Sequence, residues 1–245
     1  MLRRLVLSRI RRALPHFAAL FATIMVLAWC GPAVAQTPQF LPEIDTYLNL
    51  NSDTRVWFQA KQTREAGVPN QAEIGPSIDY YWKSLPKLAK IAVVDANRSE
   101  SRVLVLSAGY RYLPHASGAR GTNRMEPVAT LQLPLIGGFV VSDRNRADLD
   151  WESGGFDWRY RNRLRVRRPL AVGSHRFTVY AGAEAFYLSR FQKWSSTDLS
   201  AGFCVPLTKK LELNPYYEHE NNTGGAPNQQ VNALGLLLNL YFSLH

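Results

Sequence analysis

Five arginines, Arg159, Arg161, Arg163, Arg165 and Arg167, recur at every second position of segment 157–168. A period of two is the period of a β-strand, so all five guanidinium groups lie on one face of that strand. Guanidinium groups bind carboxylates and other oxyanions through pairs of hydrogen bonds. The spacing therefore predicts either a set of internal ion pairs or a positively charged surface that attracts anions.

The opposite face of this segment is apolar and aromatic, with Trp158, Tyr160, Leu164 and Val166. The core of a soluble protein cannot hold five arginines beside such a face. A barrel whose outside meets lipid and whose inside meets water accommodates both faces of the strand. The alternation predicts an all-β, antiparallel transmembrane barrel with the arginines inside.

Carboxylates on later segments are predicted to face the same interior. The predicted charged wall of the lumen consists of Arg159, Arg161, Arg163, Arg165, Arg176, Glu184, Asp198, Glu212 and Glu218. Two interpretations stay open. In the first, the charges pair across a narrow barrel and brace it, because buried charge is tolerated when it is paired. In the second, some guanidinium groups stay unpaired along a water path and favour anions.

One segment has polar residues on both faces. Arg144, Arg146 and Asp148 lie on one side of segment 137–149, and Asp143 and Asn145 lie on the other. Alternation alone does not show which set faces the interior, so we expect a bulge or a change of register there.

The rest of the chain contains further alternating segments of about ten residues separated by turn residues. Eleven are clear, at 43–50, 54–63, 72–82, 101–112, 125–134, 137–149, 157–168, 175–187, 196–205, 210–219 and 231–242. A bacterial single-chain barrel with both ends in the periplasm needs an even number of strands. We therefore predict twelve strands, with the missing one at Leu88–Asp95, and ten strands as the alternative.

The first 35 residues have the pattern of a cleaved secretory signal peptide. Arginines precede an apolar run from Phe17 to Trp29, which is too short for a spanning helix, and an Ala-x-Ala site ends at Ala35. Cleavage would remove half of the net charge of +10 and leave residues 36–245 as one barrel domain. Cys204 would then be the sole cysteine, which excludes an internal disulfide.

The last segment favours export to the outer membrane. It places Leu234, Leu236, Leu238, Leu240 and Phe242 on one face, and a final amphipathic strand ending in an aromatic residue resembles the signal read by the barrel-assembly machinery. That machinery and outer-membrane lipid are the expected partners, with small anionic solutes as candidate cargo. Nucleic-acid binding has no support beyond basic charge.

Catalytic motifs are absent from the sequence. We find no metal-ligand spacing, phosphate loop or nucleophile motif, and we expect no cofactor and no enzymatic activity. His219, beside Glu218, Glu220 and Asn221 near the expected outer rim, is the one suggestive acid–base group. A rim hydrolase at His219 is therefore the alternative from the enzyme class, and a soluble secreted or periplasmic β-sandwich is a further alternative.

Several short motifs carry a family resemblance. They are Pro42–Tyr47, Ala72–Pro76, Gly109–Tyr112, Ser142–Arg146, Trp158–Arg163, Ala183–Tyr187 and Pro215–Glu218, of which the two Arg-Asn-Arg motifs are the most telling. Together they resemble the bacterial envelope family called domain of unknown function 2490. The resemblance implies an outer-membrane barrel, and it transfers no catalytic or ligand residues because the family has no established activity. The arginine-rich lumen leads us to expect a narrow channel or a structural protein of the envelope.

Overall fold

A computed structural model describes residues 39–65, 68–85, 98–114, 121–152, 154–173, 175–224 and 228–244. The predicted signal peptide, its cleavage site at Ala35 and the predicted strand at Leu88–Asp95 lie outside these residues. Within them, no helix has the length and apolar character needed to cross a membrane. The barrel is the unit formed by Pro38–Leu170 and Arg176–His245.

All eleven clear segments form strands in the described part of the chain. The strands are β1 (Gln39–Asn49), β2 (Thr54–Glu65), β3 (Val68–Ser84), β4 (Arg102–Leu113), β5 (Thr122–Pro134), β6 (Val140–Glu152), β7 (Gly155–Val172), β8 (His175–Leu188), β9 (Lys193–Pro206), β10 (Leu211–Asn222) and β11 (Gln229–Ser243). Three 3₁₀ turns, η1 (Arg98–Ser101), η2 (Ile136–Gly138) and η3 (Ser189–Phe191), stand between strands.

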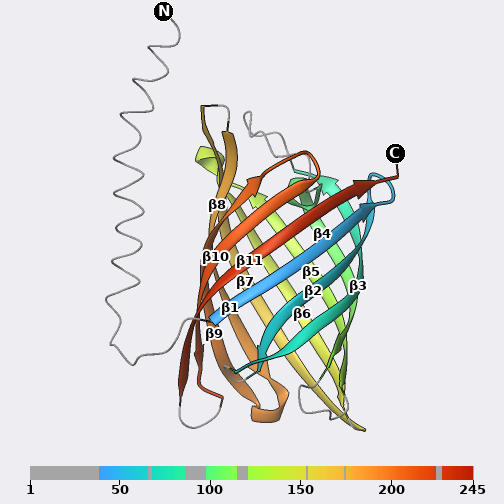
Figure 1. Cartoon of the computed structure of the whole chain (residues 1–245), viewed down its shortest axis with the longest axis vertical. Helices are drawn as coiled ribbons and strands as arrows, with labels where there is room; N and C mark the ends of the chain where they lie inside the picture. Colours follow the sequence, from blue (N-terminus) through green and yellow to red (C-terminus); the bar gives the residue numbers. More distant parts are fainter. Residues whose placement is uncertain are drawn as a thin grey trace, which may run out of the picture. The chain divides into compact units, whose positions relative to one another are not determined.

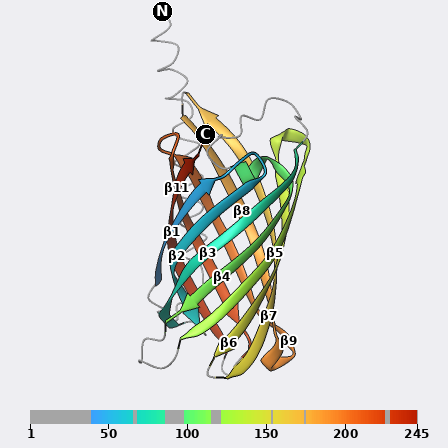
Figure 2. The ribbon, with the colours of Figure 1, turned by 90° about the vertical axis from the view of Figure 1, so that its right-hand side faces the viewer.

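The strands close into one barrel in which neighbours in sequence are neighbours in the sheet. Figures 1 and 2 show tilted strands around a common axis. This arrangement confirms the all-β closed barrel and excludes a two-sheet sandwich. The wall contains eleven strands rather than the predicted twelve or the alternative ten, because β3 pairs directly with β4 and the described strands already close the ring.

An odd number of strands requires one parallel pair, and it joins β1 to β11. Their register runs from Gln39 opposite Ala233 to Asn49 opposite Ser243, and Figure 1 shows the two strands side by side and pointing the same way. The rings of Tyr47 and Tyr241 stack across this pair with centroids 5.0 Å apart. The expectation that both ends of the barrel chain lie on one side is therefore wrong: β1 starts at the end opposite to that where β11 finishes.

Alternation in the sequence decides which side chains face the interior, because successive residues of a strand point to opposite faces. On β11, Ala233 and Tyr241 are buried inside, while Leu234 and Leu236 are exposed outside. On β6 the arginine-bearing set faces inward: Arg146 and Asp148 are buried, and no bulge interrupts the β6–β7 register. The side of β6 that contains Asp143 and Asn145 therefore points outward, and this decides the question that alternation left open.

One close contact inside the sheet requires glycine. An ideal Cβ on Gly75 of β3 would lie 2.1 Å from the backbone oxygen of Tyr110 on β4. A side chain there would push the two strands apart, so Gly75 permits the close approach of β3 and β4 beside the charged interior.

Candidate functional site

The candidate site is the lumen of the barrel, an internal cavity of about 580 Å³ with a mostly charged and polar lining. All eleven strands contribute inward-facing side chains to it. The arginine-rich face of β7 lies along this cavity, with β6 and β8 beside it in the sheet. Two groups of arginines within the lining differ in their partners.

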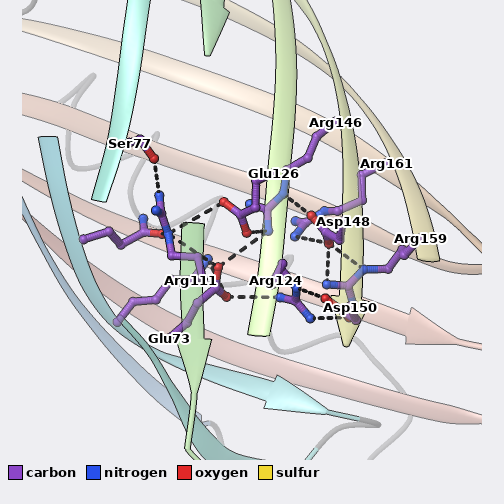
Figure 3. A network of polar contacts seen from close by, with 12 residues as sticks. Glu73, Ser77, Arg111, Arg124, Glu126, Arg146, Asp148, Asp150, Arg159 and Arg161 are labelled. Carbon is purple, nitrogen blue, oxygen red and sulfur yellow. Dashed lines mark hydrogen bonds and ion pairs between the residues drawn. The ribbon is translucent and has the colours of Figure 1, made fainter. Parts of the chain in front are cut away.

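The first group belongs to a network of ion pairs that runs from Glu73 of β3 to Glu184 of β8. Figure 3 shows the part of it between Glu73 and the β7 residues Arg159 and Arg161. Its centre is Asp148 of β6, whose side chain has no exposed surface and pairs with Arg146 and with Arg159, the latter at 2.6 Å. Arg161 adds a contact of 3.9 Å to Asp148 and donates to Glu184 of β8 at 2.8 Å. Three guanidinium groups therefore share one buried carboxylate.

The network continues through the two buried glutamates Glu73 and Glu126. Arg146 pairs with Glu126 and lies 3.5 Å from Glu73. Arg111 of β4 is fully buried and lies 3.9 Å from Glu73 and 3.7 Å from Glu126, and Arg124 of β5 pairs with Asp150 at 2.6 Å. Because Glu73, Glu126 and Asp148 each contact more than one cation, the charges in this part of the lumen compensate one another, which is what burial of charge demands.

The second group, which we call the arginine trio, consists of Arg144, Arg163 and Arg165. Arg144 of β6 and Arg163 of β7 stand directly opposite each other in the antiparallel register, and Arg165 is the next inward residue of β7. All three line the cavity. Within the part of the chain that the structure describes, none of the three forms an ion pair with a carboxylate. Arg165 instead lies over the ring of Tyr180, 4.3 Å from its centroid.

Like charges directly opposite each other destabilise a sheet. The trio retains this cost inside a wall of low dielectric, where a concentration of positive charge attracts anions. The planar guanidinium fork offers paired hydrogen-bond donors to a carboxylate, phosphate or sulfate oxygen pair. The geometry of the trio is therefore suited to holding or passing an oxyanion.

The structure separates the arginines that the sequence grouped together. Arg159 and Arg161 belong to the paired network, whereas Arg163 and Arg165 belong to the trio. The prediction that Arg176 belongs to the charged wall of the lumen is wrong, because Arg176 is exposed near the start of β8 and is not part of the cavity lining. It stands at the strand end, beyond the length over which the lumen is enclosed.

The predicted carboxylates all line the cavity but differ in their contacts. Glu184 binds Arg161, and Glu212 accepts hydrogen bonds from Asn239 at 2.8 Å and from Tyr241 at 3.3 Å. Asp198 makes no ion pair with any described arginine, and Glu218 lines the lumen beside it on β10. Of the carboxylates predicted on β8, β9 and β10, Glu184 is thus the one paired with the arginine-rich strand among the residues described.

The structure does not bring His219 together with Glu218 and Glu220, the residues considered as an acid–base group at the rim. His219 faces outward, where its Nδ1 lies 2.8 Å from Asn232 Oδ1 and beside the Tyr217 hydroxyl, which donates to the same oxygen. Glu218 and Glu220 face the lumen from the other side of β10. In the described ranges no three His, Cys, Asp or Glu side chains are grouped so as to hold a metal ion.

Sequence reasoning missed most of the network. Arg111, Arg124, Glu126 and Asp150 were not singled out, although each alternates with an outward residue as Arg111 does between Tyr110 and Tyr112. That alternation was the available signal. The pairing partners themselves depend on register between strands, which the sequence does not state.

Fold and lumen together define a closed β-barrel with a charged interior. The family model described as "Protein of unknown function (DUF2490)" matches residues 44–231, so the chain belongs to this family. The resemblance seen in the sequence motifs is thereby confirmed. No curated protein matches the chain.

Two solved structures are similar in backbone. A "Bacterial polysaccharide outer membrane secretin" matches with a TM-score of 0.48 and 8% identity over 75% of this chain and 63% of that chain. An "Anion-selective porin from Comamonas acidovorans" matches with a TM-score of 0.38 and 14% identity over 77% of this chain and 53% of that chain. This chain spans less than two thirds of the length of either structure.

Proposed function

We propose that this protein is an outer-membrane barrel whose lumen is a narrow, water-filled passage that favours small anions, and that it performs no catalysis. The observation that carries the proposal is the arginine trio, three inward guanidinium groups that form no ion pair with a carboxylate in the described ranges, beside a cavity of about 580 Å³. The ion-pair network has a second role in this proposal. It braces the wall around the passage and leaves the trio as a local concentration of positive charge.

The outward face supports placement in a membrane. Aromatic side chains gather at one end of β6–β9, where Trp151 contacts Phe156 and Tyr187 contacts both Trp158 and Trp194. Exposed Tyr80 and Trp82 stand at the opposite end, on β3. Two aromatic girdles around an apolar band are typical of barrels that cross an outer membrane. The signal-peptide pattern in residues 1–35 predicts that the chain is exported.

Single-channel recording tests the anion preference. Protein purified from outer membranes is inserted into planar bilayers, and the reversal potential is measured under a salt gradient for the wild type and for Arg144→Gln/Arg163→Gln. A unit charge 4 Å away contributes about 1 kcal/mol in water, so each lost guanidinium lowers the permeability of anions by roughly fivefold and raises that of cations by a similar factor.

A matched control removes one positive and one negative charge from the paired network. Arg161→Gln/Glu184→Gln deletes a 2.8 Å pair and leaves the charge of the lumen unchanged. We expect its selectivity to stay at the wild-type value. Equal selectivity in the wild type and the trio variant, or no conductance in conditions where a known porin conducts, would contradict the proposal.

A further inference from the structure

The outward face of β6 and β7 contains a polar patch in the middle of an apolar wall. The patch consists of Asp143 and Asn145 on β6 and Asn162 on β7. The two asparagines are the outward-facing residues of the Arg-Asn-Arg motifs, and Asp143 directly precedes the first motif. Leu131 and Leu164 flank Asp143 on the neighbouring strands, and both are exposed. Among described residues between the strand ends, Asp143 is the one outward-facing carboxylate.

Hydrogen bonds tie the patch together. The Asn162 amide donates to Asp143 Oδ1 at 2.7 Å and to Asn145 Oδ1 at 3.1 Å, and the Tyr160 hydroxyl donates to the same Asn145 oxygen. These contacts fix the three side chains in a plane along the wall, although each of them retains further bonding capacity.

Several polar groups of the patch have no partner among the described residues. The second carboxylate oxygen of Asp143, the amide nitrogen of Asn145 and the amide oxygen of Asn162 make no hydrogen bond there, and no cation pairs with Asp143. Acyl chains of lipid offer neither donors nor acceptors. A barrel standing alone in a bilayer would therefore leave two acceptors and one donor group unsatisfied.

Small residues flank the asparagine side of the patch, whereas Leu131 and Leu164 flank Asp143. Ala129 of β5 pairs with Asn145, and Ala147 pairs with Tyr160. Gly182 of β8 lies against Leu164 and Arg165, so alternation places Ala183 and Ala185 on the outward face beside β7. Short side chains on both flanks allow the backbone of a second sheet to approach the polar groups closely.

We propose that this patch is the contact surface for a second copy of this chain within the membrane. The inference rests on the proposed placement of the barrel in a membrane. A second copy offers the complementary groups: the Asn145 amide of one barrel donates to the free oxygens of Asp143 and Asn162 of the other, and a two-fold axis repeats the same bonds in reverse. The phosphate of a lipid headgroup fits less well, because it has no N–H group to donate to the free oxygens of Asp143 and Asn162.

Cysteine cross-linking in native outer membranes tests the contact. Ala147→Cys is placed at the edge of the patch in the full chain carrying Cys204→Ser, and Ala60→Cys provides a matched outward alanine on β2. After mild oxidation, Ala147→Cys runs mainly as a covalent dimer of twice the mass. Ala60→Cys and the parent Cys204→Ser chain remain monomeric. A monomeric Ala147→Cys protein, or equal cross-linking at both sites, overturns the proposal.

A second measurement separates loss of contact from loss of fold. Asp143→Leu/Asn145→Leu/Asn162→Leu makes the wall uniformly apolar, which a lipid-facing strand tolerates. We expect this variant to keep the heat-modifiable migration of a folded barrel and to lose the Ala147→Cys cross-link. Retention of the cross-link in the folded triple variant contradicts the proposal. Wild-type protein that conducts anions but stays monomeric would remove the interface and leave the proposed function intact.

Discussion

The buried carboxylate of Asp148 makes the ion-pair network directly testable. Asp148→Asn keeps the size and shape of the side chain but removes its negative charge. Arg146 then retains Glu126, and Arg161 retains Glu184. Arg159 loses its one carboxylate partner in the described residues and becomes an unpaired charge within the lumen. The cost of the substitution is therefore set mainly by Arg159.

The magnitude follows from the burial of the pair. Two unit charges 4 Å apart interact by about 4 kcal/mol at an effective dielectric constant of 20. Leaving a buried charge without its partner costs about 3–5 kcal/mol in measured proteins. Asp148 has no exposed side-chain surface, but Arg159 is 26% exposed, so solvent compensates part of the loss. We expect the free energy of unfolding to fall by about 3 kcal/mol, the lower end of that range.

Equilibrium urea unfolding of the barrel in lipid vesicles, followed by tryptophan fluorescence, measures this fall as a lower midpoint at unchanged slope. Asp150→Asn is the control, because Asp150 is 22% exposed and its partner Arg124 keeps Glu73. It should cost about 1 kcal/mol or less. In the double variant Asp148→Asn/Arg159→Gln, part of the loss should be recovered. An equal cost for the two single variants, or no recovery, would refute the assignment of Arg159 as the orphaned charge.

Three further predictions concern selectivity, packing and topology. Asp148→Asn should also raise the anion preference of the channel, measured as a larger reversal potential, because the freed Arg159 adds a positive charge to the lumen; a shift toward cations would contradict this. Gly75→Ala should destabilise the barrel by about 1–3 kcal/mol in urea unfolding, since its methyl group meets a backbone oxygen, whereas Gly155→Ala, with its nearest neighbour at 3.4 Å, should have little effect. Epitope tags placed ahead of Gln39 and after His245 should react with antibody from opposite sides of the membrane, and reaction of both from one side would disprove the parallel β1–β11 pair.

The strand positions were predictable because alternation is a local property of the chain. On β7, the arginines at every second position from Arg159 to Arg167 mark the strand and its two faces without any knowledge of the neighbouring strands. On β6 the same reasoning stopped, because Asp143 and Asn145 make the second face polar as well. The outward face of a strand is normally recognised because it is apolar and the inward face is polar. On β6 this difference is missing, because the outward face contains the polar residues Asp143 and Asn145.

The strand count and the partners of each arginine were not predictable. Both depend on how strands meet, and the sequence pattern of one strand contains no register. Arg161 and Arg163 have the same spacing and the same face, and each stands opposite an arginine of β6. Among the described residues, however, the β8 carboxylate Glu184 forms an ion pair with Arg161 and not with Arg163. The twelfth strand was inferred from the rule that bacterial single-chain barrels have an even number of strands. That rule assumes antiparallel pairing throughout, and the parallel β1–β11 pair lets an odd number of strands close the barrel.

The parallel pair also determines the order in which the chain can assemble. Every other pairing joins strands consecutive in the sequence, so the sheet can grow one neighbouring strand at a time. The β1–β11 pairing alone links distant parts of the chain, Gln39 with Ala233, and its loop-closure entropy is lost only when the ring closes. Until that step both edge strands keep rows of unpaired backbone groups, which can template pairing with other chains. Closure of this one seam, between two edges that run in the same direction, therefore ends the exposure of the unfinished barrel to such pairing.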